Sequence, residues 1–280
     1  KMTDDERVLD SQRKLYRKAK EEQSFRFYVL YDKVCLPHVL RESYRRVKAN
    51  RGAPGVDGVT FKTLKAEGEA EFIEAIRKEL TEKRYRPSPV LRVMIPKPNG
   101  KMRPLGIPTI RDRVVQMACK MIIEPIFEAD FQDESYGFRP RRSAKDAVKA
   151  IKGHLKAGRE QVYDADLSSY FDTIPHGKLL TLTGLRIADR QILHLIKQWL
   201  KAPVEEDGKI SGGKKSRVGT PQGGVISPLL ANIYLNLVDK LINRMRGIPE
   251  DVRIVRYADD FVLMGRKITA RVIRKLHEVL

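Results

Sequence analysis

The residues of this chain whose type and spacing could do chemistry are aspartates. Asp259 and Asp260 separate two apolar runs, Val252–Tyr257 and Phe261–Met264, that have the composition of β-strands. A short polar break between such runs is typical of a β-hairpin, and Asp is tolerated in tight turns. The pattern predicts a hairpin with two carboxylates at its tip, and an ordinary Asp-containing turn is the simpler alternative.

A second acidic segment lies upstream. The run Val162–Leu167 alternates like a strand, so Asp164 and Asp166 lie on one face of it. If this strand is a neighbour of the hairpin, three or four carboxylates converge at one sheet edge, where they need cations to stay ionised. Two Mg²⁺ ions about 3.5–4 Å apart would neutralise them and could clamp the oxygens of a phosphoryl displacement. Spacing alone does not choose between Asp164 and Asp166.

The composition sets the class of protein. The chain has 280 residues, 41% of them hydrophobic, which is enough for one large domain or two small ones. No apolar run approaches the roughly 18 residues of a membrane span, and the charged start does not resemble a signal peptide. With only two cysteines, Cys35 and Cys119, a disulfide framework or a zinc site is not expected. We therefore expect a soluble, non-secreted protein of a reducing compartment, with no membrane partner.

The net charge of +19, from 55 Lys and Arg against 36 Asp and Glu, indicates a polyanionic partner. Nucleic acid fits better than a membrane surface, because no single basic amphipathic helix dominates. The glycine-rich loop 50–58 and the lysine stripe of a predicted helix over 143–155 could contact phosphates, although a plain surface loop and a solvated helix face are the simpler interpretations. The candidate RNA-binding residues are Arg51, Gly52, Lys145 and Lys149.

Two further hairpins carry cations. In the first, Val90–Ile95 alternates, Asn99-Gly100 gives a strong turn signal and Lys101–Ile107 returns. A solvated edge protected by basic residues is the alternative explanation for its charge. The second hairpin is predicted over Val204–Val218, with Asp207-Gly208 as a turn signal. The cations on the first hairpin are Arg92, Lys97, Lys101 and Arg103.

Hydrophobic spacing predicts helices along most of the remaining chain. They are expected over 25–49, around 72–80, over 110–127, 143–155, 189–200 and 227–242, and from 269 onward, after a polar segment of helical or frayed character that ends near 23. In the helix over 143–155, Val148, Ile151 and Leu155 are expected to face inward, and the Ser143/Asp146 pair resembles a capping box.

Six boxes of sequence carry a family resemblance. Tyr257-Ala258-Asp259-Asp260 resembles the YADD box of reverse transcriptases, and Asp166–Asp172 resembles their first catalytic motif. Four more boxes are similar to those of the group II intron reverse transcriptase/maturase family, in family order between about Phe25 and Met264. They are Arg51–Gly58 (RGAPGVDG), Ile95–Pro108 (IPKPNGKMRPLGIP), Ser135–Pro140 (SYGFRP) and Thr220–Asn232 (TPQGGVISPLLAN).

The resemblance implies an α+β right-hand polymerase. Its fingers would consist of helices and hairpins, and its palm of a small antiparallel sheet backed by helices, with the thumb absent from this stretch. We accordingly expect a charged N-terminal arm at residues 1–24, fingers at 25–159 and a truncated palm at 160–280. A truncated palm would expose sheet edge and apolar surface, which favours self-association as a homodimer.

The resemblance also implies roles for single residues. Asp166 and Asp259 would be the principal Mg²⁺ ligands, with Asp260 as the third carboxylate. Tyr170 resembles the steric gate that favours deoxynucleotides, and Gln222 would lie beside the nascent base pair and template. The cations that would hold the incoming triphosphate are Lys97 and Arg103, followed by Lys101 and Arg92.

The implied activity is RNA-directed DNA polymerisation with two Mg²⁺ ions, deoxynucleoside triphosphates, an intron RNA template and a DNA primer. Such an enzyme copies intron RNA for retrohoming and assists splicing as a maturase, in a bacterial cytoplasm or an organelle. Two alternatives stay open: an RNA-binding splicing maturase module without physiological polymerase activity, and a related reverse transcriptase used in defence.

Overall fold

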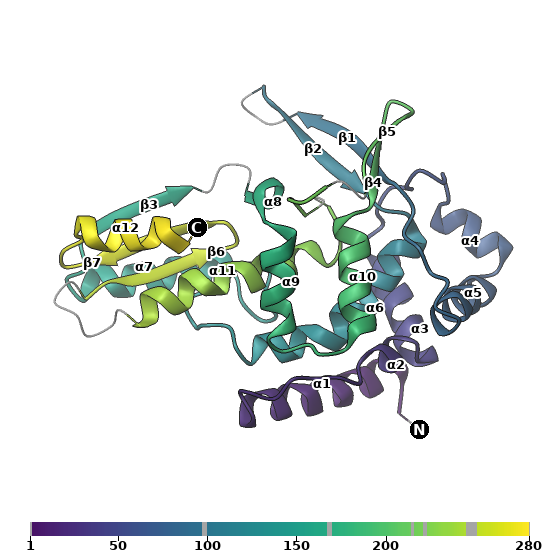
Figure 1. The fold of residues 1–280 in the computed structure, drawn as a ribbon, viewed down its shortest axis with the longest axis horizontal. Coiled ribbons are helices and arrows are strands. Elements are labelled where there is room, and N and C mark those ends of the chain that lie inside the picture. The colour runs from purple at the N-terminus through teal and green to yellow at the C-terminus, as the bar shows by residue number, and fades with distance from the viewer. Residues whose placement is uncertain are drawn as a thin grey trace. The chain divides into compact units, whose positions relative to one another are not determined.

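The computed structural model describes residues 2–96, 100–166, 170–213, 216–220, 223–244 and 251–279, which form two compact units (Figure 1). Unit 1 comprises Lys1–Asp130 and Phe171–Ser227, and unit 2 comprises Phe131–Tyr170 and Pro228–Leu280. Each unit has its own β-sheet. None of the helices in the described ranges is long and apolar enough to cross a membrane.

Most of the described helices lie in unit 1. They are α1 (Asp4–Glu21), α2 (Tyr31–Val34), α3 (Pro37–Ala49), α4 (Phe61–Glu67), α5 (Glu69–Thr81), α6 (Ile110–Glu128), α9 (His176–Gly184) and α10 (Arg190–Leu200), with the short α8 (Tyr170–Thr173) at the sequence boundary. Helix α6 is largely buried, because α1, α2 and α3 all pack against it. The helices predicted around 72–80, over 110–127 and over 189–200 are confirmed, with small shifts of their ends.

The N-terminal segment is a packed helix. A capping box between Thr3 and Glu6 starts α1, and its Val8, Leu15 and Ala19 are buried on one side. The Gln12 side chain donates a hydrogen bond of 2.9 Å to a backbone carbonyl of α6. The charged residues of this segment therefore form the outer face of an amphipathic helix.

The helix predicted over 25–49 is interrupted at its start. Val29 is 53% exposed and lies outside any helix, and α3 begins only at Pro37. The physical reason is competition for backbone groups: the Phe27 carbonyl accepts bonds from the amides of residues 188 and 189, and the Asp189 carboxylate accepts bonds of 2.8 Å from the amides of residues 30 and 31. These tertiary hydrogen bonds replace the helical ones.

The sheet of unit 1 joins both predicted cationic hairpins. Its order is β2 (Met102–Ile107), β1 (Val90–Pro96), β4 (Pro203–Glu206), β5 (Lys209–Gly212). The hairpins β1–β2 and β4–β5 are antiparallel, as predicted, whereas β1 and β4 pair in parallel. The β4–β5 turn has positive φ at both Asp207 (50°) and Gly208 (75°), which is the conformation of a type I′ turn.

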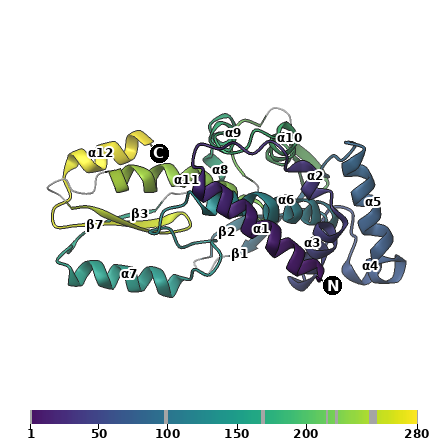
Figure 2. The ribbon, with the colours of Figure 1, turned by 90° about the horizontal axis from the view of Figure 1, so that it is seen from below.

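Unit 2 holds a three-stranded sheet in the order β3 (Gln161–Asp166), β7 (Asp260–Gly265), β6 (Arg253–Tyr257), with helices α7 (Ala144–Lys156), α11 (Ser227–Arg244) and α12 (Ala270–Val279). Figure 2 shows α7 on one side of this sheet and α11 and α12 on the other.

The Ser143/Asp146 capping box at the start of α7 is confirmed. The prediction that Val148 and Leu155 of α7 face inward is wrong, since they are 49% and 43% exposed. Only the side of the helix that carries Ala147 is buried, so the apolar face of α7 is wider than the area that packs against the rest of unit 2.

Candidate active site

The candidate active site of unit 2 lies where β3 and β7 meet. These strands are antiparallel neighbours, as the carboxylate cluster requires, and their register places Asp166 opposite Asp260. Asp164 pairs with Val262, two positions farther from the hairpin tip. Strands β6 and β7 close with the pair Tyr257 and Asp260. Asp166, Asp259 and Asp260 therefore come together at one end of the sheet.

The hairpin tip differs from its prediction by one residue. Asp260 is the first residue of β7, so the two connecting residues are Ala258 and Asp259. Ala258 carries the unusual backbone conformation, with φ of 60°, which is strained for a residue with a Cβ and costs roughly 1–3 kcal/mol. Ala258 is buried, Asp259 is half-buried and Asp260 is exposed. The sequence predicts this turn from the tolerance of Asp for turn conformations, but the residue with positive φ is Ala258.

Carboxylates from two strands are a donor set that suits Mg²⁺, which prefers oxygen ligands. The backbone of Asp166 is described and its side chain is not. In the described part of the chain, no group of three His, Cys, Asp or Glu side chains is gathered as a metal site. The fit of the donor set to Mg²⁺ therefore rests on the strand register and on residue type.

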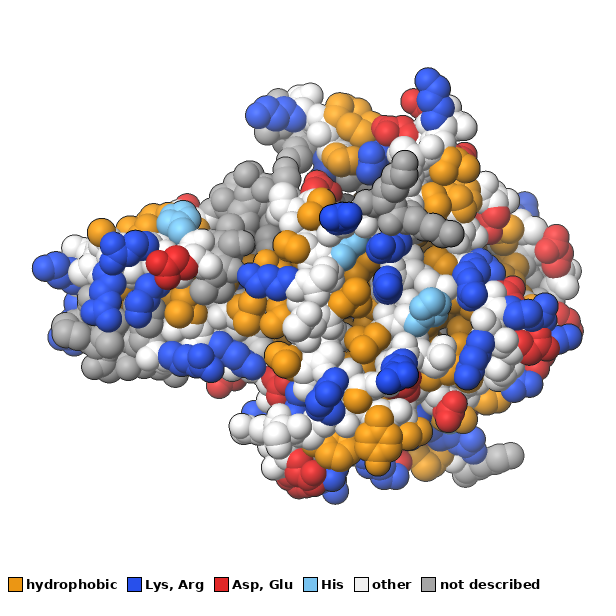
Figure 3. Space-filling view, viewed as in Figure 1, with side chains coloured by type: hydrophobic (Ala, Val, Ile, Leu, Met, Phe, Trp, Pro, Cys, Tyr) orange, Lys and Arg blue, Asp and Glu red, His pale blue; other side chains and the backbone are white. Residues whose placement is uncertain are grey.

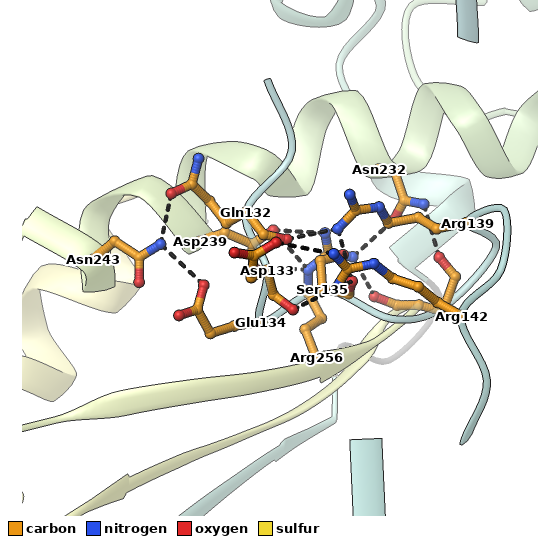
Figure 4. A network of polar contacts seen from close by, with 12 residues as sticks. Gln132, Asp133, Glu134, Ser135, Arg139, Arg142, Asn232, Asp239, Asn243 and Arg256 are labelled. Atoms are coloured by element: carbon orange, nitrogen blue, oxygen red, sulfur yellow. Dashed lines mark hydrogen bonds and ion pairs between the residues drawn. The ribbon is translucent and has the colours of Figure 1, made fainter. Parts of the chain in front are cut away.

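A buried polar network lies directly behind the hairpin tip (Figure 4). Arg256 of β6 is fully buried, and its guanidinium donates hydrogen bonds of 2.7–3.2 Å to the Asp239 carboxylate of α11, also fully buried. The Arg256 Nη1 donates bonds of 2.8 Å to both the Asn232 side-chain oxygen and the Ala258 carbonyl. The sequence predictions missed this network, because nothing in the local sequence distinguishes Arg256 from Arg253 in the same strand.

The Ser135–Pro140 box lines the other side of the network. The Arg256 amide donates a hydrogen bond of 2.9 Å to the carbonyl of residue 134, and the amide of residue 136 donates one of 2.8 Å to the Arg256 carbonyl. Together the two bonds form an isolated parallel β-bridge. Asn232 donates a bond of 2.9 Å to the Gly137 carbonyl. A Cβ on Gly137 would overlap the backbone nitrogen of Ala258, so only glycine fits there. Arg139 secures this loop with bonds to the carbonyls of residues 132 and 135.

The predicted triphosphate-binding cations lie in unit 1. Arg92, Lys101 and Arg103 are exposed on β1–β2, and Arg92 is 3.6 Å from the Glu206 carboxylate of β4. Lys97 lies outside the described residues. In this unit a cavity of about 410 Å³ is lined by Arg92 and parts of β1, β2, β4 and the loop before α11.

The Thr220–Asn232 box begins beside β2 within unit 1. Gly223 has φ of 101°, and a Cβ on it would overlap the Gly106 carbonyl of β2. The Thr220 amide donates a bond of 2.6 Å to the carbonyl of Phe171, and the His176 ring bonds to the Gly219 carbonyl at 2.6 Å. Gln222 lies outside the described residues, and only the backbone of Tyr170, which starts α8, is described.

The predicted RNA-binding residues lie on the surface. Lys145 and Lys149 are exposed on α7, and Arg51 is exposed in its loop. The loop glycines have a packing role that the sequence did not reveal. A Cβ on Gly55 would lie 2.8 Å from the backbone of residue 109, and one on Gly52 would overlap the Arg113 guanidinium, which itself bonds the carbonyl of residue 53 at 2.6 Å.

Further cations in unit 2 were not among the predicted residues. Figure 3 shows Lys and Arg side chains gathered over the region of α12. The exposed cations in and just before this helix are Arg266, Lys267, Arg271 and Arg274. A basic face of this kind attracts a phosphate backbone.

Comparisons with known proteins match this chain to the reverse transcriptases. The sequence model of a family described as reverse transcriptase (RNA-dependent DNA polymerase) matches residues 95–280. The chain is 39% identical to protein YkfC of Escherichia coli strain K12, over 96% of this chain and 79% of YkfC. It is 40% identical to the group II intron-encoded protein LtrA of Lactococcus lactis subsp. cremoris, over 79% of this chain and 36% of LtrA.

Two other similarities extend this picture. The chain is 31% identical to a putative COX1/OXI3 intron 2 protein of Saccharomyces cerevisiae, over 71% of this chain and 23% of that protein. Among solved structures, a chain of a partial Cas6-RT-Cas1–Cas2 complex matches with a TM-score of 0.54 at 22% identity, covering 89% of this chain and 41% of that chain. Similarity at this identity concerns the fold. The chain thus spans about a third or less of the intron-encoded relatives and most of YkfC.

Proposed function

The chain belongs to the group II intron reverse transcriptase/maturase family, as its six sequence boxes predict, and from that premise we propose that it supplies the polymerase site of an RNA-directed DNA polymerase. The observation that carries the proposal is the strand register. It sets Asp166 opposite Asp260, with Asp259 in the adjoining turn, so that three carboxylate residues from two strands share one end of the sheet.

In this proposal Asp166, Asp259 and Asp260 would hold two Mg²⁺ ions. When bound, such ions would lower the pKa of the primer 3′-hydroxyl and balance charge on the triphosphate. The protein's own part is to hold the carboxylates at a fixed separation, because phosphoryl transfer depends mainly on positioning and charge. Asp164 would stay outside the site, since its partner in the register is Val262.

The substrate contacts follow the family pattern. The triphosphate would bind the cations of β1–β2, including Lys97 and Arg103, while Tyr170 would select deoxynucleotides and Gln222 would contact the nascent pair. Arg51, Gly52, Lys145 and Lys149 would bind template RNA through its phosphates. Residues 25–159 would act as fingers, 160–280 as palm and 1–24 as a charged N-terminal arm.

The biological role we propose is copying of intron RNA for retrohoming from a DNA primer, with assistance to splicing. The names of the matched relatives, which include intron-encoded proteins and mitochondrial nuclear intron maturases, support this role. It would place the protein in a bacterial cytoplasm or an organelle.

Primer extension on poly(rA)/oligo(dT) by the full-length protein tests the proposal. Asp259→Asn should lower the extension rate at least about a thousandfold, because losing a metal ligand removes several kcal/mol of transition-state stabilisation. The matched control is Asp164→Asn, an exposed aspartate on β3, for which we expect no more than about a twofold change. RNA affinity should be the same in all three proteins.

Two outcomes would contradict the proposal. Extension by the Asp259→Asn variant at the parental rate would remove the carboxylates from the chemistry. Tight RNA binding without extension by any of the proteins would favour a maturase module that does not polymerise.

A further inference from the structure

We propose that Arg256 is a positioning residue, which fixes the Ala258–Asp259 turn from behind through the buried network it forms with Asp239 and Asn232. The inference rests on the proposed function, because it takes Asp259 as a residue that must be held in place. It concerns residues that contact neither substrate nor metal in that scheme. All of them belong to unit 2.

The first step of the argument is the strain in the turn. Ala258 adopts φ of 60°, a conformation that an Ala-Asp turn would not select by itself. A residue in such a conformation persists only where surrounding contacts determine it. The direct contact is the 2.8 Å hydrogen bond from the Arg256 Nη1 to the Ala258 carbonyl, which ties the turn to the strand that leads into it.

The second step is the charge of Arg256. Its side chain is fully buried, and the equally buried Asp239 compensates it with bonds to two guanidinium nitrogens. A buried ion pair of this kind contributes little net stability, because the loss of hydration offsets the attraction, and an apolar pair of similar volume often stabilises as well. Stability alone therefore does not explain why the pair is present. The planar guanidinium explains it, because its several N–H donors reach the turn carbonyl and Asp239 at the same time.

The third step is the clamp on the opposite side of the turn. Asn232 accepts from Arg256 at 2.8 Å and donates to the Gly137 carbonyl at 2.9 Å, so one side chain links the two. Gly137 in turn packs its backbone against the nitrogen of Ala258. The carbonyl of Ala258 is held by Arg256, its nitrogen side is covered by Gly137, and the backbone from which Asp259 projects is fixed.

The test removes the network without leaving a buried charge. In the double variant Arg256→Met/Asp239→Leu the ion pair is replaced by apolar side chains, so the fold should survive. We expect thermal unfolding close to the parent, an unchanged KM for deoxynucleotide, and a kcat lowered about a hundredfold, as for a small misplacement of a reacting group. Hydrogen exchange of amides 257–260 should quicken at least about tenfold while the centre of β7 stays protected.

Control variants distinguish the effect of the buried network from effects of other changes in β6 and from a failure of the proposed function. Arg253→Met removes another arginine of β6, one that pairs with Asp251 at 2.8 Å, and should leave kcat and exchange at the turn unchanged. If the double variant does not fold, Arg256→Lys keeps the charge beside Asp239 without the fork, and the same losses are expected. A folded variant with parental exchange at residues 257–260, or with parental kcat, overturns the inference. If the parent does not extend primers, the proposed function fails and the exchange data still decide the role of Arg256.

Discussion

The two hairpins that carry the candidate chemistry are anchored at opposite ends. Hairpin β6–β7 is fixed at its tip, where the buried Arg256 binds the Ala258 carbonyl at 2.8 Å. Hairpin β1–β2 is fixed near its base, where the amide of Ser88 donates a bond of 2.9 Å to the buried Asp112 carboxylate. Farther along β1 the side chains are exposed, as at Ile95, which is 44% exposed.

This difference matches what each hairpin would have to do. Metal-binding carboxylates must keep a fixed separation, so their turn is held by a network that leaves it little freedom. Cations that bind a triphosphate gain from long side chains on a strand pair that can adjust to its ligand, because the contact depends mainly on charge. The comparison predicts that damage near β6–β7 lowers kcat, whereas damage on β1–β2 raises KM.

The two anchoring carboxylates also differ in what neutralises them. Asp239 is paired with a guanidinium, whereas Asp112 accepts bonds from the Tyr85 hydroxyl at 2.8 Å and from an amide, with Arg111 at 3.5 Å. Burial raises the pKa of the Asp112 carboxyl above its usual value, against the opposing effect of Arg111. The stability of the base of β1–β2 should therefore depend on pH through Asp112.

Among changes outside the carboxylates themselves, the largest effect is expected from Gly137→Ala. The new Cβ would overlap backbone atoms of Ala258, which cannot move as a flexible side chain would. We expect kcat to fall by about a hundredfold or more and the free energy of unfolding to drop by about 1–3 kcal/mol. Gly153→Ala in α7 is the matched control, because a Cβ there meets nothing within 4 Å, and it should leave kcat unchanged while stabilising slightly. Parental kcat in Gly137→Ala would show that the turn can shift freely.

A smaller effect, on stability and its pH dependence, is expected from Asp112→Asn. Because the folded pKa of Asp112 is raised, its contribution to stability is fully present below the unfolded value, near 3.8, and is lost as pH rises through the folded value. The variant should lack this decline, and it should cost about 1–3 kcal/mol at low pH because the new amide faces the Ser88 amide. Urea unfolding from about pH 4 to about pH 7 measures both effects.

Asp146→Asn is the control of opposite sign for this titration. Hydrogen bonds from Ser143 lower the pKa of Asp146, so its contribution to stability is lost as pH falls. Equal pH slopes for the parent and Asp112→Asn would contradict a raised pKa of the Asp112 carboxyl.

The smallest effect is expected from Arg103→Gln on β2. Removing one exposed cation should raise the KM for deoxynucleotide about tenfold, the size of one charge-assisted hydrogen bond, and leave thermal stability and kcat unchanged. Lys209→Gln on β5, an exposed cation of the same sheet, is the control and should change little. A fall in kcat with constant KM would mean that the cationic hairpin positions reacting groups as the acidic one does.

Local signals in the sequence predicted much of this structure. Alternation and turn residues located β6–β7 and the two hairpins of unit 1, and Ser143 with Asp146 marked the start of α7. The neighbouring position of β3 and β7 was only a condition for the predicted carboxylate cluster, and the strand pairing meets it. Such signals depend on residues close together in the chain, so they can be recognised from the sequence alone.

What the sequence did not predict depends on distant residues. The parallel pairing of Val90 with Val204 joins two hairpins that the sequence predicted as separate elements. The exposed Val29 follows from a competing carboxylate, Asp189, far along the chain. Arg256 gave no sign of its role, because an arginine in a strand more often lies at the surface, and only its partners from α11 show that it is buried.

The division into units has a consequence for synthesis of the protein. The chain passes from one unit to the other at 130/131, 170/171 and 227/228. During synthesis, β3 of unit 2 is therefore made before α10 and β4 of unit 1. Until β4 is made, β1 has no parallel partner. The unpaired edge of β1 is therefore a surface that chaperones would have to shield until β4 has been made.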